Sequence, residues 1–127
     1  MINVEKLLQK LLAQPSIQFK KLQPWMLPKK TAGVYMITAK DKPYYVGRTK
    51  NLRRRLPEHL NGPPQSARLK KYLADSGECA NFEEAKQFLL EHATFQWIEE
   101  ADMRTRYFLE CYATAMLQPK YGVSEEH

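Results

Sequence analysis

The chain has 127 residues, of which 43% are hydrophobic, and carries a formal net charge of +6 with a pI near 9.3. This length and apolar content predict one domain with its own core, and the positive charge favours a polyanionic partner. Its two cysteines lie far apart without a CxxC or histidine-rich neighbourhood, which argues against a zinc site or a disulfide framework.

The first residues carry the pattern of an amphipathic helix that ends before Pro15. Its apolar face is formed by Val4, Leu7, Leu8, Leu11 and Leu12. Such a helix either covers the domain's own core or docks onto a second copy or a partner protein. Residues 13–32 contain further prolines, and we expect an irregular connection that docks through Trp25 and Met26. Residues 1–30 are therefore interpreted as an N-terminal helix with a proline-containing connection.

The N-terminus is polar and charged rather than an apolar signal core, and no apolar run approaches membrane-spanning length. We therefore expect a cytoplasmic protein without membrane contact.

A hairpin is predicted next. Two apolar runs, Gly33–Thr38 and Tyr44–Gly47, flank a polar segment with the composition of a turn. Pro43 weakens the start of the second strand but does not forbid it. The runs carry the triplets Gly33-Val34-Tyr35 and Tyr45-Val46-Gly47. Two tyrosines, Tyr35 and Tyr45, are thus expected on neighbouring strands.

A helix follows the hairpin, with Asn51 as a suitable N-cap. Its apolar stripe is formed by Leu52, Leu56 and Leu60. Arg55 and His59 lie on the edge of this stripe. A charge turned toward a low-dielectric interior is costly, so Arg55 needs an anionic partner, either a carboxylate or a ligand phosphate.

Two more helices and a strand are expected in the middle of the chain. The helices are Arg68–Asp75 and Phe82–His92, and the second begins after Asn81 with Glu84 in the capping-box position. Thr94–Ile98 alternates as a strand does.

The last predicted helix places an acid on an apolar stripe. The stripe is formed by Met103, Tyr107, Cys111, Thr114 and Leu117. Glu110 belongs to it, three residues after Tyr107, and a short strand over Tyr121–Val123 is a further possibility. The order of elements predicts a small α+β domain in which helices flank a central three-stranded antiparallel sheet.

Arg55 and Glu110 are thus a cation and an anion that both face inward. They either form a buried ion pair with each other or face a common ligand. The tyrosine pair and the basic helix favour the ligand.

Taken together, these residues resemble the GIY-YIG nucleases, a family that includes the N-terminal incision domain of a bacterial excision-repair subunit and homing and restriction endonucleases. The similarity runs from the first triplet through Tyr45–Leu52 to Arg55. It resumes at Glu110 and continues to Pro119-Lys120-Tyr121. The resemblance implies a GIY-YIG-like nuclease domain over residues 31–123, followed by a polar tail over residues 124–127.

Two features depart from the family pattern. Gly122 stands where the family often has an asparagine, and the stretch between the two triplets is short. Neither departure affects the residues expected to be catalytic.

The resemblance implies a metal-dependent DNA endonuclease. One inward carboxylate suits a single Mg²⁺ or Mn²⁺, so Glu110 is the expected metal ligand. Arg55 would clamp the scissile phosphate, and Tyr35 and Tyr45 would flank the attacking water, one of them as the general base. His59 would either relay a proton or orient a tyrosine or phosphate.

Binding of duplex or branched DNA is expected to rest on a cluster of basic residues around the hairpin and its helix. Its members are Arg48, Lys50, Arg53 and Arg54. Tyr44 and Tyr72 are expected to be core residues rather than base-stacking ones. The alternative function is a catalytically weak nucleic-acid-binding or interaction module of a repair, restriction or mobile-element complex. The sequence does not distinguish DNA from RNA.

Overall fold

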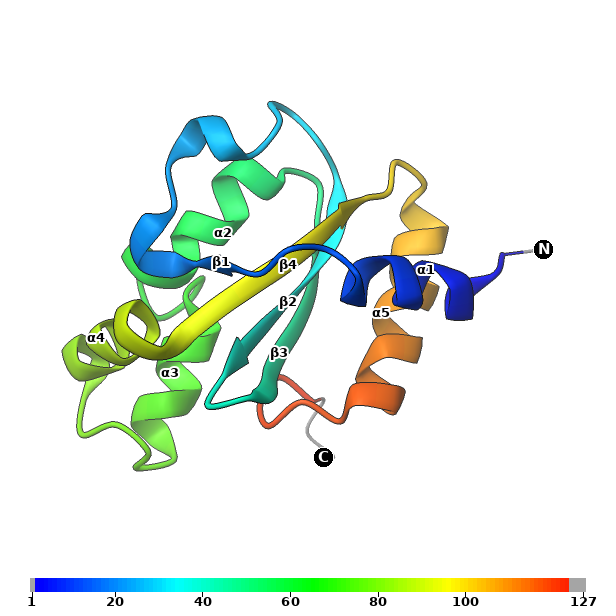
Figure 1. Cartoon of the computed structure of the whole chain (residues 1–127). Helices are drawn as coiled ribbons and strands as arrows, with labels where there is room; N and C mark the ends of the chain where they lie inside the picture. The colour runs from blue at the N-terminus through cyan, green and yellow to red at the C-terminus, as the bar shows by residue number, and fades with distance from the viewer. Residues whose placement is uncertain (1, 124–127) are drawn as a thin grey trace.

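The computed structural model describes residues 2–123, so the predicted polar tail over residues 124–127 lies outside the described part (Figure 1). In chain order its elements are α1 (Val4–Leu12), β1 (Ile17–Gln18), the 3-10 turns η1 (Phe19–Lys21) and η2 (Pro24–Met26), β2 (Gly33–Ala39), β3 (Lys42–Thr49), α2 (Leu52–Asn61), α3 (Arg68–Asp75), α4 (Phe82–His92), β4 (Ala93–Glu99) and α5 (Met103–Leu117). The predicted α+β class and the position of every predicted helix are confirmed.

The strands form one antiparallel sheet in the order β1-β4-β2-β3. The three long strands are those predicted, and β1 adds a fourth that is only two residues long, pairing Ile17 with Phe95. A strand this short leaves no alternating pattern to detect in a sequence. Within the described residues β3 forms one edge of the sheet, and this edge carries the second tyrosine triplet.

Helices cover both faces of the sheet (Figure 1). On one face α2, α3 and α4 enclose the larger apolar cluster, which includes Tyr35, Leu56 and Phe95. On the other face α1 and α5 pack together over a smaller cluster, which includes Leu11 of α1 and Leu109 of α5. The apolar face of α1 is thus used within the domain, as expected of a helix that covers its own core.

The connection after α1 docks differently from the prediction. Trp25 is 74% exposed, and the fully buried side chains of this stretch are Phe19 and Leu27. The two 3-10 turns rotate Phe19 toward Phe95 of the sheet, with ring centroids 5.0 Å apart, and leave Trp25 at the surface. The expected docking through Trp25 was therefore wrong.

The rotation of α5 also differs from the prediction. Its buried residues are Thr105, Arg106, Leu109 and Ala113. Met103, Tyr107 and Cys111 of the predicted inward stripe are exposed. Polar residues, among them Arg104, Thr105 and Glu110, are spread around the helix, so its periodicity does not select one face. Glu110, next to Leu109, is only partly buried.

The predicted strand over Tyr121–Val123 is not formed. The backbone N–H groups of Lys120 and Tyr121 instead donate to the carbonyls of Pro43 and Tyr44 at 3.1 and 3.0 Å. The chain therefore lies against the beginning of β3 and leaves the later residues of this edge strand uncovered within residues 2–123.

Candidate active site

The two tyrosines of the triplets lie on adjacent strands of the sheet. Tyr35 in β2 pairs with Gly47 in β3, and Tyr45 lies two residues before that glycine. The Tyr35 ring crosses Gly47 so closely that a Cβ atom there would lie 2.4 Å from Tyr35 Oη. Without a side chain at position 47 the Tyr35 and Tyr45 rings approach to 6.4 Å between centroids. The glycine of the second triplet therefore makes room for the tyrosine of the first.

His59 of α2 holds the Tyr35 hydroxyl. Its Nε2 lies 2.8 Å from Tyr35 Oη, and the imidazole is fully buried. Burial, together with the positive charges of Arg55 and Lys70, lowers the pKa of His59 to about 3, so the ring is neutral. The other ring nitrogen, Nδ1, has no hydrogen-bond partner among the described residues.

This unpartnered nitrogen indicates the tautomer of His59. An unsatisfied buried N–H costs more than an unfilled lone pair, so we assign the proton to Nε2. In this tautomer Nε2–H donates to Tyr35 Oη, and the hydroxyl proton of Tyr35 is available to another acceptor in the site.

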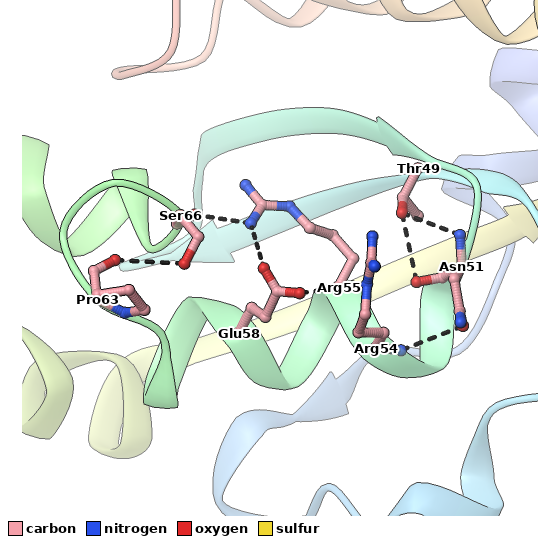
Figure 2. A network of polar contacts seen from close by, with 7 residues as sticks. All are labelled: Thr49, Asn51, Arg54, Arg55, Glu58, Pro63 and Ser66. Atoms are coloured by element: carbon pink, nitrogen blue, oxygen red, sulfur yellow. Dashed lines mark hydrogen bonds and ion pairs between the residues drawn. The ribbon is translucent and has the colours of Figure 1, made fainter.

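Arg55 lies one helical turn before His59, and Figure 2 shows its contacts. Its Nη1 donates to the Ser66 carbonyl at 2.7 Å and to Glu58 Oε2 at 3.3 Å. Within residues 2–123 it does not form the ion pair with Glu110 that the sequence left open. The carboxylate it required is Glu58 on its own helix, a residue that the sequence reasoning missed although it stands in the favourable i+3 position.

Both phenols of the site are protonated. Burial raises the pKa of Tyr35, and the nearby Tyr45 raises it further, whereas the guanidinium of Arg55 opposes the shift. Burial also raises the pKa of Tyr45, again against Arg55. Tyr35 is 1% exposed, whereas Tyr45 is partly open to solvent. Tyr45 is therefore the phenol that water reaches.

Glu110 reaches the same site from α5, on the opposite face of the sheet. Its carboxylate approaches Arg48, the residue after Gly47 in β3, and its charge raises the pKa of both Tyr35 and Tyr45. Burial raises the pKa of Glu110, against the influence of Arg48. Arg48 is the one cation within ion-pairing distance among the described residues, and its Nη1 lies 3.7 Å from Oε1.

The four predicted DNA-binding residues differ in their exposure and in the groups that they contact. Arg48 and Lys50 are exposed near the end of β3. Arg54 is exposed and pairs with Glu58 at 3.4 Å. Arg53 donates to the Leu27 carbonyl at 2.8 Å and is partly buried, so it fastens the N-terminal connection to α2.

A second polar cluster fixes the C-terminal chain beside the site, and the sequence reasoning missed it. Glu78 accepts hydrogen bonds from Tyr44 at 2.5 Å, Tyr121 at 2.6 Å and Lys120 at 2.7 Å. Bonds from Lys120, Tyr121 and Tyr44 to the Glu78 carboxylate outweigh its burial and lower its pKa to about 2. Tyr44 is a core residue, as expected, and Tyr72 stacks on Tyr121 with ring centroids 5.9 Å apart.

Gly122 follows this cluster directly. It has φ +83°, and a Cβ atom there would lie 2.8 Å from the Tyr45 ring. A side chain at this position would therefore collide with a tyrosine of the site.

Residues 2–123 contain no group of three or more His, Cys, Asp or Glu side chains that could hold a metal ion. No described helix combines the length and the apolar character that crossing a membrane requires.

Comparison with known proteins gave one family and one set of structures. The model of the GIY-YIG catalytic domain matches residues 31–104, a range that ends before Glu110. One similar structure is the GIY-YIG N-terminal endonuclease domain of UvrC from Thermotoga maritima, bound to magnesium as its catalytic divalent cation. It is 27% identical to this chain with a TM-score of 0.49, and the match covers 94% of this chain and 98% of that chain. A point mutant of that domain, bound to its catalytic divalent cation, is 26% identical over the same shares with a TM-score of 0.48. No curated protein matches significantly.

Proposed function

The chain belongs to the GIY-YIG family of nuclease catalytic domains, and from this membership we propose that it is an endonuclease that hydrolyses phosphodiester bonds in DNA with one divalent metal ion. The observation that carries the proposal is the convergence at the open edge of β3. Tyr35, Tyr45, Arg55 and His59 come from one side of the sheet, and Glu110 comes from the other.

Arg55 is proposed to bind the scissile phosphate. One of its nitrogens is anchored by Ser66 and Glu58, which fixes the plane of the guanidinium. Its side chain is 16% exposed, so it meets an anion in a partly dehydrated setting, where a charge-assisted bidentate contact is strong.

Tyr45 is proposed as the general base because it is the phenol that water reaches. Tyr45 would first lose its own proton to solvent, and its phenolate oxygen would then take a proton from the attacking water; the neighbouring Arg55 charge favours the phenolate. His59 Nε2–H donates to Tyr35 Oη, so the Tyr35 hydroxyl would donate its own proton to another hydrogen-bond acceptor in the site. His59 is then a positioning residue that fixes the direction of the Tyr35 hydroxyl.

Glu110 is proposed to hold the metal. Its partly exposed carboxylate has one distant ion-pair partner in the described structure, which leaves oxygen lone pairs for a hard cation. Mg²⁺ and Mn²⁺ suit such a position because Mg²⁺ keeps several waters and takes one or two carboxylates plus substrate oxygens. When bound, the cation would neutralise charge on the phosphate, stabilise the leaving oxygen and lower the pKa of nearby phenols.

DNA is proposed as the substrate because positive charge continues outward from the site. Arg48, Lys50 and Arg54 are exposed near the open edge of β3 and the beginning of α2. Contacts of this kind follow the phosphate backbone without reading sequence. We propose residues 31–123 as the catalytic unit and residues 1–30 as a layer packed onto it.

The test is nicking of supercoiled plasmid DNA in the presence of Mg²⁺, with chelation by EDTA as a reference. Glu110→Gln keeps the shape of the side chain and removes its charge, so cleavage should fall about a hundredfold or more while the circular dichroism spectrum is unchanged. Glu91→Gln is the matched control, because this carboxylate is 68% exposed and belongs to α4. Undiminished Mg²⁺-dependent cleavage by Glu110→Gln would place the metal elsewhere. Salt-dependent DNA binding without any cleavage by the wild type would identify a binding module instead.

A further inference from the structure

The outer face of α5 exposes aromatic side chains next to the proposed metal ligand. Tyr107 is 48% exposed and Phe108 is 40% exposed. Tyr107 stands three residues before Glu110, which corresponds to a rise of about 4.5 Å along the helix and to the same side of it. A large exposed ring therefore lies within one helical turn of the carboxylate at which the reaction is proposed to occur.

Arg48 joins this ring to the site. Its guanidinium lies 4.9 Å from the centroid of the Tyr107 ring and 3.7 Å from the carboxylate of Glu110. The side chain of Arg48 is 41% exposed, so the cation covers the tyrosine while remaining open to solvent. The guanidinium of Arg104 covers the neighbouring Phe108 in the same way, 5.4 Å from its ring centroid. This second pair lies on the side of α5 that faces a surface hollow lined also by Ile2, Val4 and Tyr112. Tyr107 does not line that hollow.

An aromatic ring covered by a guanidinium, both exposed, has the chemistry that binds an unstacked nucleotide. The ring and the planar cation each offer a surface for a base, and the positive charge suits the adjoining phosphate. A phosphate bound to a cation at Glu110 would place its neighbouring nucleotide close to Tyr107, because this ring lies within one helical turn of the carboxylate.

We propose that Tyr107 and Arg48 form a subsite for the unpaired base of the nucleotide adjoining the scissile phosphate. This inference rests on the proposed function and specifies its substrate class. A base within an intact duplex has both faces stacked, so the subsite selects DNA that is single-stranded, frayed or branched at the cleavage position. Tyr107 is thus a specificity-determining residue, and the enzyme prefers a splayed strand over an intact duplex.

The experiment combines removal of the ring with removal of the base. Binding of a splayed-arm DNA is measured by fluorescence anisotropy in the cleavage-deficient Glu110→Gln background, with an abasic site placed in turn at each nucleotide flanking the fork junction. Because binding is measured without cleavage, the result does not depend on the outcome of the nicking assay.

At one flanking nucleotide, the abasic site should weaken binding about tenfold when Tyr107 is present and less than about twofold in Tyr107→Ala. Tyr107→Phe keeps the ring and should keep the penalty. Phe108→Ala is the matched control, an exposed aromatic one residue further along α5, and should also keep it. Circular dichroism checks that each variant is folded.

An abasic penalty that is the same with and without Tyr107 at every position would overturn the inference, even if the wild type cleaves DNA. The inference would also fail if Tyr107→Ala and Phe108→Ala changed the oligomeric state and left DNA binding unchanged, because the face would then serve protein association. Absence of Mg²⁺-dependent nicking, together with an intact coupling between Tyr107 and the base, would refute the proposed cleavage and leave the subsite standing.

Discussion

Acidification should destabilise the domain through His59 in a defined pH window. The imidazole is fully buried, its pKa is lowered to about 3, and its unfolded-state value is 6.5. Because the folded-state value is the lower one, the unfolded chain binds the proton first as the pH falls. The stability contributed by the neutral ring is therefore complete above pH 6.5 and is lost progressively below it, down to about pH 3.

The expected size follows from this difference. Each pH unit below the unfolded-state pKa removes about 1.4 kcal/mol, so the loss between pH 8 and pH 5 is about 2 kcal/mol. In urea this corresponds to an unfolding midpoint about 1 M lower at pH 5. The pKa of Glu78 is lowered from 4.5 to about 2, so the stability that its carboxylate contributes is lost mainly below pH 4.5, outside the range from pH 8 to pH 5.

The assay is urea unfolding at pH 8, 6.5, 5.5 and 5, followed by tryptophan fluorescence, for wild type and His59→Gln. Glutamine does not titrate, so the variant should lose about 2 kcal/mol less than wild type between pH 8 and pH 5. His92→Gln, which replaces an exposed histidine, is the control and should behave as wild type does. Equal pH dependence in wild type and His59→Gln would show that the buried imidazole is not held neutral, and would remove the basis of its assigned tautomer.

Three further results are expected. Arg55→Lys should lose nearly as much kcat as Arg55→Ala in the nicking assay, because an ammonium cannot reproduce the planar contact; recovery of most of the rate would reduce the role to a generic charge. Gly47→Ala should lower both the melting temperature and kcat, because the new Cβ would lie 2.4 Å from Tyr35 Oη, and unchanged values would mean that the ring moves freely. Replacing Lys50 and Arg54 together by alanine should reduce the slope of log Kd against log salt by about two, and an unchanged slope would place the DNA on another surface.

The rotation of α2 could be predicted from the sequence, whereas that of α5 could not. The side chain of Asn51 accepts from the Arg54 N–H and fixes the first turn of α2, and basic residues separate its leucines. The contrast between apolar and charged positions therefore selects one face. In α5 the buried face includes Thr105 and Arg106, which an apolar stripe does not predict, and the packing of this face with α1 fixes the rotation.

Partners from distant segments were also beyond the reach of the sequence. Local patterning identified Arg55 as a cation that needs an anion, but its shortest hydrogen bond is to the carbonyl of Ser66, a group that any residue supplies. In the second polar cluster, Glu78 and Tyr121 lie 43 positions apart. Such contacts depend on how the segments meet in space, and neither periodicity nor composition encodes this.

The exposed edge of β3 also has a consequence for the behaviour of the protein in solution. Unpaired strand edges promote self-association, because another chain can add a strand to them. Lys120 and Tyr121 block the first part of this edge through the carbonyls of Pro43 and Tyr44, and beyond it the strand presents the charge of Arg48. The cation proposed to meet DNA therefore also keeps the edge soluble, so a variant that neutralises it loses a nucleic-acid contact and a safeguard against strand-mediated oligomers together.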